Sequence, residues 1–277
     1  MSQKIDKDRV LLDIHGPIAT ITLNRPEKRN ALYPAMILRL VDRLEEVRRN
    51  GRIRALVLRG AGESFCAGDD LSPEDRFKYG PPNLQTRMRV GYQRVSLDLL
   101  SLRKPVIAML RGYAVGSGFD LALACDFRVA SPTTRFAAIY VKRGLGGGTA
   151  YLLPRYVGFG KATELLLRGE FVDIDTALQL NLVTEVVDEN ELEARTYKLA
   201  EELASGPTEA IGAIKIARNT GLGGDPYQGY EAQTWANIEL MFHKDAREGP
   251  RAFAARRKPH YTGEWIDLQY DPPSSYD

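Results

Sequence analysis

One stretch of the chain combines a predicted buried strand, a glycine-rich turn and the start of a helix. Val106–Leu110 is apolar throughout, residues 112–118 contain three glycines and predict a turn, and Phe119–Cys125 is again mostly apolar. Glycines at positions 116 and 118 let the backbone approach a ligand closely, and the first turn of a helix presents N–H groups that have no partner inside the helix. Such a turn can bind a developing oxyanion, or its glycines can serve only to pack the helix tightly on the strand.

Asp120 is the acidic residue in the first turn of this predicted helix. A carboxylate at that place can stabilise the helix dipole, and it can also act as an acid or base where its surroundings shift its pKa. We interpret Asp120 as functional because it faces the same glycine turn.

A second loop of small residues follows a second predicted strand. Ala55–Leu58 is apolar, and the loop after it places Ala67 beside Gly68. Small side chains again reduce this loop to its backbone. A second loop of this kind favours ligand binding over simple packing as the role of the glycines.

Together, the stretches Gly60–Leu71 and Lys104–Ala130 closely resemble the signature of the crotonase family, the enoyl-CoA hydratase/isomerase superfamily. Further segments that resemble the family follow in the same order: Leu23–Leu32, Leu153–Gly158, Ala177–Val187 and Arg247–Phe253. The resemblance covers roughly residues 8 to 262 and implies an α/β fold, a spiral of β-β-α units with a helical C-terminal region. It also implies that this region joins subunits into a homotrimer or a dimer of trimers.

The resemblance places an oxyanion hole at two backbone N–H groups, those of Asp69 and Ser117, which would bind the thioester oxygen of an acyl-CoA. Ala67, Gly116 and Gly118 are the neighbouring substrate contacts that it implies. It implies no metal and no cofactor other than coenzyme A, which is part of the substrate. Loss of one such donor typically costs about 100- to 1,000-fold in rate.

The acid and base positions depart from the hydratase pattern of the family. Hydratases carry two glutamates, and the matching residues here are Asp120 and Tyr140. Addition of water needs two groups that move protons, and a tyrosine with a pKa near 10 is a poor base at neutral pH. The pattern argues against ordinary hydration and implies a hydratase/isomerase-like lyase or a decarboxylase, which has a tyrosine in this region. Asp120 and Tyr140 would be its polar participants.

Two alternatives stay open. In a C–C or thioester hydrolase of the same family, Asp120 or His243 would position water. His243 lies at a predicted helix start in the C-terminal region, where a histidine can also merely cap the helix or lie at the surface. A non-catalytic member would keep the acyl-CoA pocket without the chemistry, which the missing second carboxylate would explain.

Three basic residues, Arg25, Lys28 and Arg29, match the loop that contacts the adenosine phosphates of coenzyme A in the family. They can equally be solvated loop charges, because phosphates need only a diffuse basic rim.

Composition sets the remaining bounds. The 277 residues, 44% of them hydrophobic, suffice for a sizeable core, and a net charge of +2 argues against nucleic acid as a main partner. Cys66 and Cys125 lack a Cys-x-x-Cys spacing and indicate reduced thiols. No apolar run approaches the ~20 residues of a membrane span, and no signal core is present at the N-terminus. We therefore expect a cytoplasmic protein that binds no membrane.

The elements that must position these residues alternate along the chain. Val10–Ile14 and Ile18–Leu23 predict a hairpin around a Gly-Pro turn, and Tyr33–Arg49 has apolar residues at helical spacing. Helices dominate after Ser205: Glu209–Arg218, Tyr230–Phe242 and Asp245–Arg256. We divide the chain into a spiral core, residues 1–204, and a helical region for oligomerisation and pocket closing, residues 205–277.

Overall fold

The computed structural model describes residues 8–72, 84–86 and 88–266. The chain forms two compact units, Met1–Ala204 and Ser205–Asp277, which are described separately below. None of the described helices is both long and apolar enough to span a lipid bilayer.

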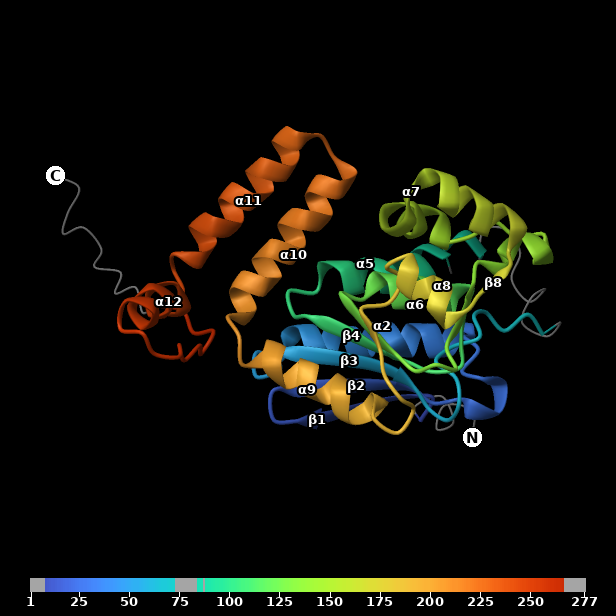
Figure 1. The fold of residues 1–277 in the computed structure, drawn as a ribbon, viewed down its shortest axis with the longest axis horizontal. Helices are drawn as coiled ribbons and strands as arrows, with labels where there is room; N and C mark the ends of the chain where they lie inside the picture. The colour runs from blue at the N-terminus through green and yellow to red at the C-terminus, as the bar shows by residue number, and fades with distance from the viewer. Residues whose placement is uncertain (1–7, 73–83, 87, 267–277) are drawn as a thin grey trace. The chain divides into compact units, whose positions relative to one another are not determined.

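A six-stranded sheet is the centre of the first unit (Figure 1). Its first two strands form an antiparallel hairpin, and every later neighbour is parallel. In spatial order the strands are β1 (Val10–His15), β2 (Ile18–Leu23), β3 (Ala55–Gly60), β4 (Val106–Leu110), β6 (Phe127–Ala130) and β9 (Glu185–Val186). The central strands are almost wholly apolar because a parallel sheet is covered on both faces.

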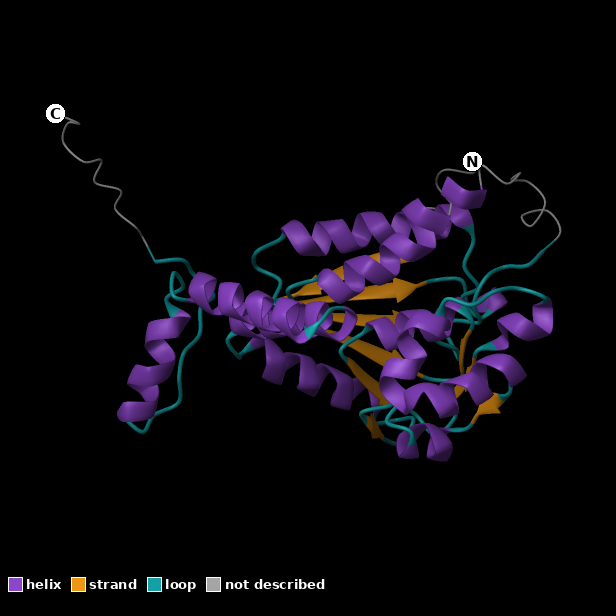
Figure 2. Ribbon diagram, turned by 90° about the horizontal axis from the view of Figure 1, so that it is seen from above, coloured by secondary structure: helices purple, strands orange, loops and turns teal. Residues whose placement is uncertain are grey.

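Helices cover the two faces of this sheet, as Figure 2 shows. On one face, α2 (Pro34–Arg49), α5 (Gln93–Ser101) and α6 (Ser117–Ala124) contribute to the larger apolar core. On the other face, α9 (Leu192–Ala204) packs through Leu192, Ala200 and Ala204. The strands contribute apolar side chains to the cores on both faces of the sheet, because successive residues of a strand point to opposite faces.

Short strand segments form a second layer that is decisive for the site. A three-stranded sheet has the order β5 (Tyr113–Val115), β7 (Arg135–Ala137) and β8 (Phe171–Val172). Two isolated parallel bridges, Leu32 with Asp69 and Cys66 with Ala114, repeat the same pairing between successive loops. The chain thus passes from a strand of the large sheet to a short extended segment and then to a helix, which is the β-β-α repeat that the sequence predicted.

One local prediction was wrong. Residues 112–118 are not simply a turn, because β5 lies inside them and α6 already begins at Ser117. The backbone of this segment is paired on both sides: Tyr113 accepts from the amide of Cys66, and β5 runs parallel to β7. These partners lie far away in the sequence, so the local glycine content pointed to a turn instead.

The remaining elements of this unit are short or irregular. They are η1 (Pro26–Lys28), the π-helical turn η2 (Met88–Tyr92), the 3-10 turn η3 (Ile139–Arg143), α7 (Thr149–Arg168) and α8 (Ile174–Gln179). Helix α7 is kinked at Gly158, where φ is 75°. Of these elements, η2, η3 and the start of α7 contribute directly to the site.

The second unit consists of the helices α10 (Thr208–Gly223), α11 (Pro226–Leu240) and α12 (Asp245–Ala254). Helix α11 begins at an Asp225 cap, whose carboxylate accepts from the amide of Gln228. Helices α10 and α11 approach closely at two glycines, since a Cβ added to Gly221 would lie 3.4 Å from the Cα of Gly229. All three predicted C-terminal helices are present, with ends shifted by a few residues.

Candidate active site

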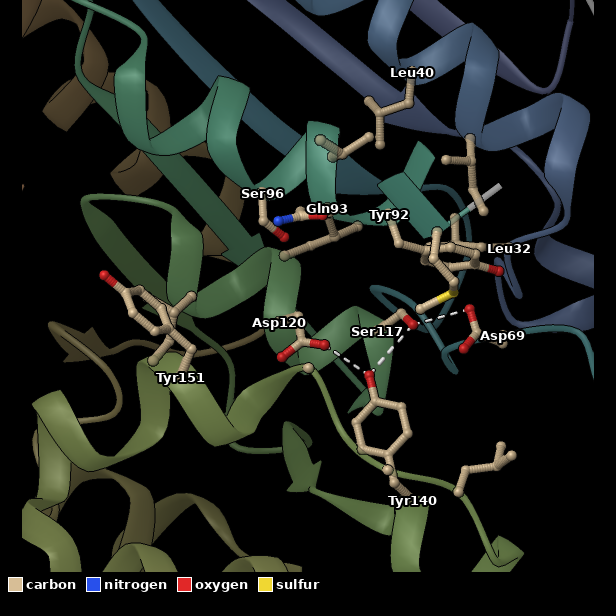
Figure 3. A pocket seen from close by; sticks show the side chains of 18 of the residues that line it. Leu32, Leu40, Asp69, Tyr92, Gln93, Ser96, Ser117, Asp120, Tyr140 and Tyr151 are labelled. Atoms are coloured by element: carbon tan, nitrogen blue, oxygen red, sulfur yellow. Dashed lines mark hydrogen bonds between the residues drawn. The ribbon is translucent and has the colours of Figure 1, made fainter. Parts of the chain in front are cut away.

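A cavity of about 910 Å³ opens in the first unit beside the first turn of α6 (Figure 3). Its wall is mainly aliphatic and aromatic, with residues from α2, η2, α5 and the start of α7. The polar lining residues include Asp69, Ser117, Asp120 and Tyr140, which gather on one side of the cavity. A large apolar chamber with a few convergent polar groups is the usual form of a small-molecule site.

The two glycine-containing loops meet at this cavity. A Cβ added to Gly68 would lie 2.7 Å from the carbonyl oxygen of Val115 and 3.4 Å from the amide nitrogen of Ser117. Gly68 also has a φ of +91°, which L side chains rarely adopt. Glycine is therefore required at this position because the two loops touch through their backbones.

The amides of Asp69 and Ser117 have geometries suited to an oxyanion. Leu32 donates to the carbonyl of Gly68 and accepts from the amide of Asp70, each over 2.7 Å, so the Asp69 N–H between them points to the other side of this bridge. Ser117 is the first residue of α6, and within the described residues its amide donates to no acceptor. Such amides can bind a negatively charged oxygen.

Asp120 projects from the first turn of α6 into the cavity (Figure 3). The hydroxyl of Tyr140, on η3, donates to Asp120 Oδ2 over 2.7 Å. The second oxygen, Oδ1, is shielded from solvent and has no hydrogen-bond partner among the described residues. The structure therefore brings together the two side chains that the sequence predicted as polar participants and leaves one carboxylate oxygen available.

The pKa of the Asp120 carboxyl is raised from its ordinary value of 3.8 to about 7, mainly by burial. The hydrogen bond from Tyr140 lowers this pKa and the negative charge of Asp69 raises it, and both effects are included in the value of about 7. Burial and the charge of Asp120 also hold the pKa of Tyr140 well above its usual value of 10. Near neutral pH, Asp120 can therefore exchange a proton, whereas Tyr140 stays protonated as a donor.

The hydrogen bonds continue from Tyr140 to a second carboxylate. The hydroxyls of Ser117 and Tyr140 lie 3.3 Å apart, and Ser117 donates to Asp69 Oδ1 over 2.9 Å. The sequence predicted roles only for the backbones of Asp69 and Ser117 and not for their side chains. The available signal was the acid that stands among small residues at the end of the Ala67-Gly68 loop.

A second cavity of about 530 Å³ adjoins the first. The two share lining residues, Asp69, Leu71, Tyr140 and Leu145. The predicted contacts Ala67 and Gly116 line the second cavity. Arg143, a basic residue that was not predicted from the sequence, lines it as well. The predicted contact Gly118 lines neither cavity; a Cβ there would lie 2.2 Å from the carbonyl oxygen of Cys66, so tight packing accounts for this glycine.

The three predicted phosphate contacts lie on or beside η1 and differ in their surroundings. Arg25 donates to Asp70 over 2.7 Å and lies against the ring of Tyr33, so it is engaged within the protein. Lys28 and Arg29 are exposed, and the guanidinium of Arg29 lies 4.9 Å from the ring centre of Tyr113.

His243 belongs to the second unit, where it is 1% exposed. Its ring lies 4.0 Å from that of Trp265, and neither ring nitrogen has a hydrogen-bond partner within the described part of the chain. It precedes α12, as the sequence predicted, but it is not a surface residue. The apolar stacking partner accounts for its burial, and its role as a base stays a prediction.

The chain is similar to known proteins over nearly its whole length. The chain is 35% identical over 265 residues to the 1,2-epoxyphenylacetyl-CoA isomerase of Escherichia coli, covering 92% of this chain and 98% of the relative. It is 36% identical to the (E)-benzylidenesuccinyl-CoA hydratase of Thauera aromatica, with 92% and 99% coverage. A crystal structure of an enoyl-CoA hydratase from Bacillus anthracis superposes with a TM-score of 0.85 at 31% identity, covering 92% of this chain and all of that one, 100%.

These similarities confirm the predicted crotonase-like α/β fold. The sequence model of the family described as enoyl-CoA hydratase/isomerase matches residues 13–264. The chain therefore belongs to the enoyl-CoA hydratase/isomerase family, within the crotonase superfamily.

Proposed function

We propose that this protein is an acyl-CoA isomerase that stabilises a thioester enolate and moves a proton with the carboxyl group of Asp120. The amides of Asp69 and Ser117 form its oxyanion hole. One observation supports this proposal above the others: Asp120 has a pKa of about 7 and one oxygen without a partner among the described residues, in the same cavity as Asp69 and Ser117. A carboxyl group with that pKa can act as base and then as acid at neutral pH.

The proposed reaction needs only this one carboxylate. Ionised Asp120 takes a proton from the carbon next to the double bond, and the electron pair of that C–H bond moves toward the thioester oxygen. The amides of Asp69 and Ser117 stabilise the resulting enolate. Asp120, now protonated, returns the proton to a different carbon of the same conjugated system, so the double bond shifts and Asp120 is regenerated.

The hydrogen bond of Tyr140 favours isomerisation over decarboxylation. A decarboxylase would use the tyrosine to orient the carboxylate of its substrate. In this structure the Tyr140 hydroxyl already donates to Asp120, and a substrate carboxylate placed there would meet a second carboxyl group. Like charges so close together are unfavourable in a buried site.

The cavity favours a bulky apolar acyl group. Leu40, Leu100 and Leu121 line it together with the rings of Tyr92 and Tyr151, and about 910 Å³ exceeds what a four-carbon acyl chain fills. Two relatives act, by their names, on acyl-CoAs with phenyl groups. We propose an acyl-CoA with an aromatic or long aliphatic tail as the substrate class.

Coenzyme A would enter through the second cavity. The oxyanion loops line it, which would bring the thioester to the amides, and Arg143 supplies a cation at its wall. The exposed side chains of Lys28 and Arg29 could form a basic rim for the phosphates.

We also propose that the chain assembles as a homotrimer or a dimer of trimers. The second unit, considered by itself, exposes large apolar side chains that an assembly would cover: Ile214, Tyr227, Tyr230, Trp235, Met241 and Phe253. Exposed apolar groups of this number typically mark protein interfaces. The mass in solution, from light scattering after gel filtration, tests this proposal, and a monomer would contradict it.

The function is tested by incubating the protein with a 3-enoyl-CoA and a 2-enoyl-CoA, each with a short aliphatic and a phenyl-bearing tail, and with a malonyl-type and a β-keto acyl-CoA. Isomerisation appears as a change of the conjugated thioester absorbance without a change of mass. Hydration adds one water, decarboxylation loses CO2, and hydrolysis of the thioester releases the thiol of coenzyme A. We expect isomerisation, faster with the phenyl-bearing substrate.

Asp120→Asn is the matched variant for this assay. It should lower turnover at least about 100-fold, the usual scale of general acid–base catalysis. Near-full activity of Asp120→Asn, or a product of one of the other three reactions, would contradict the proposed mechanism. Binding of acyl-CoA without any product would instead favour a non-catalytic member of the family.

A further inference from the structure

Four polar side chains form one continuous hydrogen-bonded chain along the wall of the larger cavity (Figure 3). The order is Asp120, Tyr140, Ser117, Asp69, and the three oxygen-to-oxygen distances are 2.7, 3.3 and 2.9 Å. This hydrogen-bonded chain of four side chains therefore has a carboxyl group at each end and two hydroxyl groups between them.

When Asp69 and Asp120 are both ionised, the two hydroxyl hydrogens are too few for the three oxygen-to-oxygen contacts. A carboxylate can only accept, so Tyr140 must donate to Asp120 and Ser117 must donate to Asp69. The contact between the two hydroxyl oxygens is then left without a hydrogen, and it is the longest of the three, 3.3 Å. One additional proton on either carboxylate provides one hydrogen for each of the three contacts.

We propose that Asp69 and Asp120 share one proton through the hydroxyls of Tyr140 and Ser117, so that the side chain of Asp69 is a second proton-holding group of this site. Its part in turnover rests on the isomerase function proposed above. Asp69 then has two roles: its amide binds the thioester oxygen, and its carboxylate is the far end of a proton relay.

The transfer leaves the two hydroxyl groups unchanged. Protonated Asp120 donates its hydrogen to Tyr140, Tyr140 passes its own hydrogen to Ser117, and Ser117 passes its hydrogen to Asp69 Oδ1. The net result is a proton lost at Asp120 and gained at Asp69. Asp120 thereby becomes ionised again and ready to remove a proton from the substrate.

Among the described residues, the other titratable groups near this hydrogen-bonded chain lie on several elements. Asp70, beside Asp69, is paired with Arg25. Tyr92 from η2 and Tyr151 from α7 line the first cavity, and Arg143 from η3 lines the second. Gly148, just before α7, adds no charge, and a side chain there would collide with the carboxylate of Asp120. Among these groups, Asp69 is the one whose charge acts on Asp120.

Ser117→Ala separates this proposal from simple electrostatics. The variant keeps both carboxylates in place, and removing a hydroxyl from a buried site would by itself leave the pKa of Asp120 unchanged or raise it. The shared proton predicts the opposite. When Asp120 is protonated, Tyr140 donates to Ser117, and the variant removes this acceptor. When Asp120 is ionised, Tyr140 donates to Asp120, and this hydrogen bond is kept. The pKa of Asp120 should therefore fall by about half a unit to one unit.

Asp69→Asn should lower the same pKa further. Its amide N–H can supply the missing hydrogen to Ser117, and the chain is then complete with Asp120 ionised. Ser96→Ala is the matched control, because Ser96 also carries a hydroxyl group and lines the same cavity but does not belong to the hydrogen-bonded chain of four side chains (Figure 3). This control should not lower the pKa of Asp120.

The measurement is an infrared pH titration of the free protein, in which the C=O band of protonated Asp120 is identified by its loss in Asp120→Asn. A fall of the pKa in Ser117→Ala and Asp69→Asn, but not in Ser96→Ala, supports the shared proton. An unchanged or raised pKa in Ser117→Ala overturns it. No substrate is needed, so failure of the isomerase assay would refute the proposed function without affecting this result.

Discussion

The hydroxyl of Tyr140 donates to the Asp120 carboxylate over 2.7 Å and so stabilises its ionised form. Tyr140→Phe removes a hydrogen bond to a charged group, and the pKa of Asp120 should rise by about one unit or more. If ionised Asp120 is the base, turnover at pH 7 should fall roughly tenfold and recover as the pH is raised. The measurement is the pH profile of kcat/KM; a loss that is equal at every pH would instead indicate that Tyr140 itself donates the proton.

The backbone of Ser117 can be tested apart from its side chain. Ser117→Pro removes the amide hydrogen assigned to the oxyanion hole at the first position of α6, where proline is otherwise compatible with a helix. We expect turnover to fall at least about 100-fold. Ser117→Ala, which keeps this N–H, should stay within about tenfold of the wild type at its own optimal pH.

A circular dichroism spectrum and a Tm close to those of the wild type would show that the proline variant is folded. Wild-type turnover by such a folded Ser117→Pro protein would remove Ser117 from the oxyanion hole.

For single residues, the sequence identified the catalytic candidates but not the hydrogen bonds that connect them. Asp120 and Tyr140 could be predicted because each occupies a position of a recognisable motif. The chain of hydroxyls to Asp69 could not, since its members come from the loop after β3, from α6 and from η3. Only the packing of the short strand segments determines that these three places meet.

The glycine segment before α7 forms part of the cavity wall and lies beside Asp120 and Tyr140. A Cβ added to Gly148 would lie 2.1 Å from Asp120 Oδ2, and one added to Gly147 would lie 2.6 Å from the ring of Tyr140. A Cβ at Gly146 would meet nothing within 4 Å. These adjacent glycines therefore differ in their surroundings, although all three belong to one run of glycines.

This difference predicts an ordered set of variants. Gly148→Ala and Gly147→Ala should each lower kcat by at least about tenfold, because they displace Asp120 and Tyr140 by more than the placement of a catalytic group tolerates. Gly146→Ala is the control, and it should keep its activity and be as stable as the wild type or slightly more so. Equal activity of all three variants would show that Asp120 and Tyr140 can relax without loss.

The longer elements could be predicted from apolar pattern alone, and the short ones could not. Helix α2 and strands β2 and β4 were expected within a few residues, because their side chains repeat at the helical or strand period. Strand β5 was missed, since three residues between glycines carry too little local signal and are held by partners elsewhere in the chain. The walls of the cavity, which come from α2, η2, α5, α6, η3 and α7, could likewise not be predicted from local pattern.

At the scale of the whole molecule, a raised pKa in a buried acid has a cost in stability. The unfolded chain ionises Asp120 near its ordinary pKa of 3.8, whereas the folded protein does so only near 7. Between these values the native state binds more protons than the unfolded state, so this group's contribution to stability is lost as the pH rises from about 4 to about 7. The carboxyl group proposed to catalyse the reaction thus destabilises the fold at working pH.

Asp120→Asn should accordingly be more stable than the wild type at pH 8 but not at pH 4, where Asp120 is protonated and close in shape to asparagine. Three pKa units set an upper limit of about 4 kcal/mol for this gain. The measurement is the difference in Tm between variant and wild type, followed by calorimetry from pH 4 to pH 8. Comparing this difference in Tm at pH 4 with that at pH 8 removes any packing effect of the asparagine that does not depend on pH.

Asp173→Asn provides a control of opposite sign. The amide of Thr176 at the start of α8 holds the pKa of Asp173 below its usual value, so its stabilising effect is present at neutral pH and is lost as the pH falls. The folded protein ionises Asp173 below its usual pKa of 3.8, so Asp173→Asn should lose stability relative to the wild type as the pH rises to about 5 and change little from there to pH 8. Asp120→Asn, in contrast, should go on gaining stability up to about pH 7. The same trend in both variants would mean that a change in net charge, and not the burial of Asp120, governs the pH dependence.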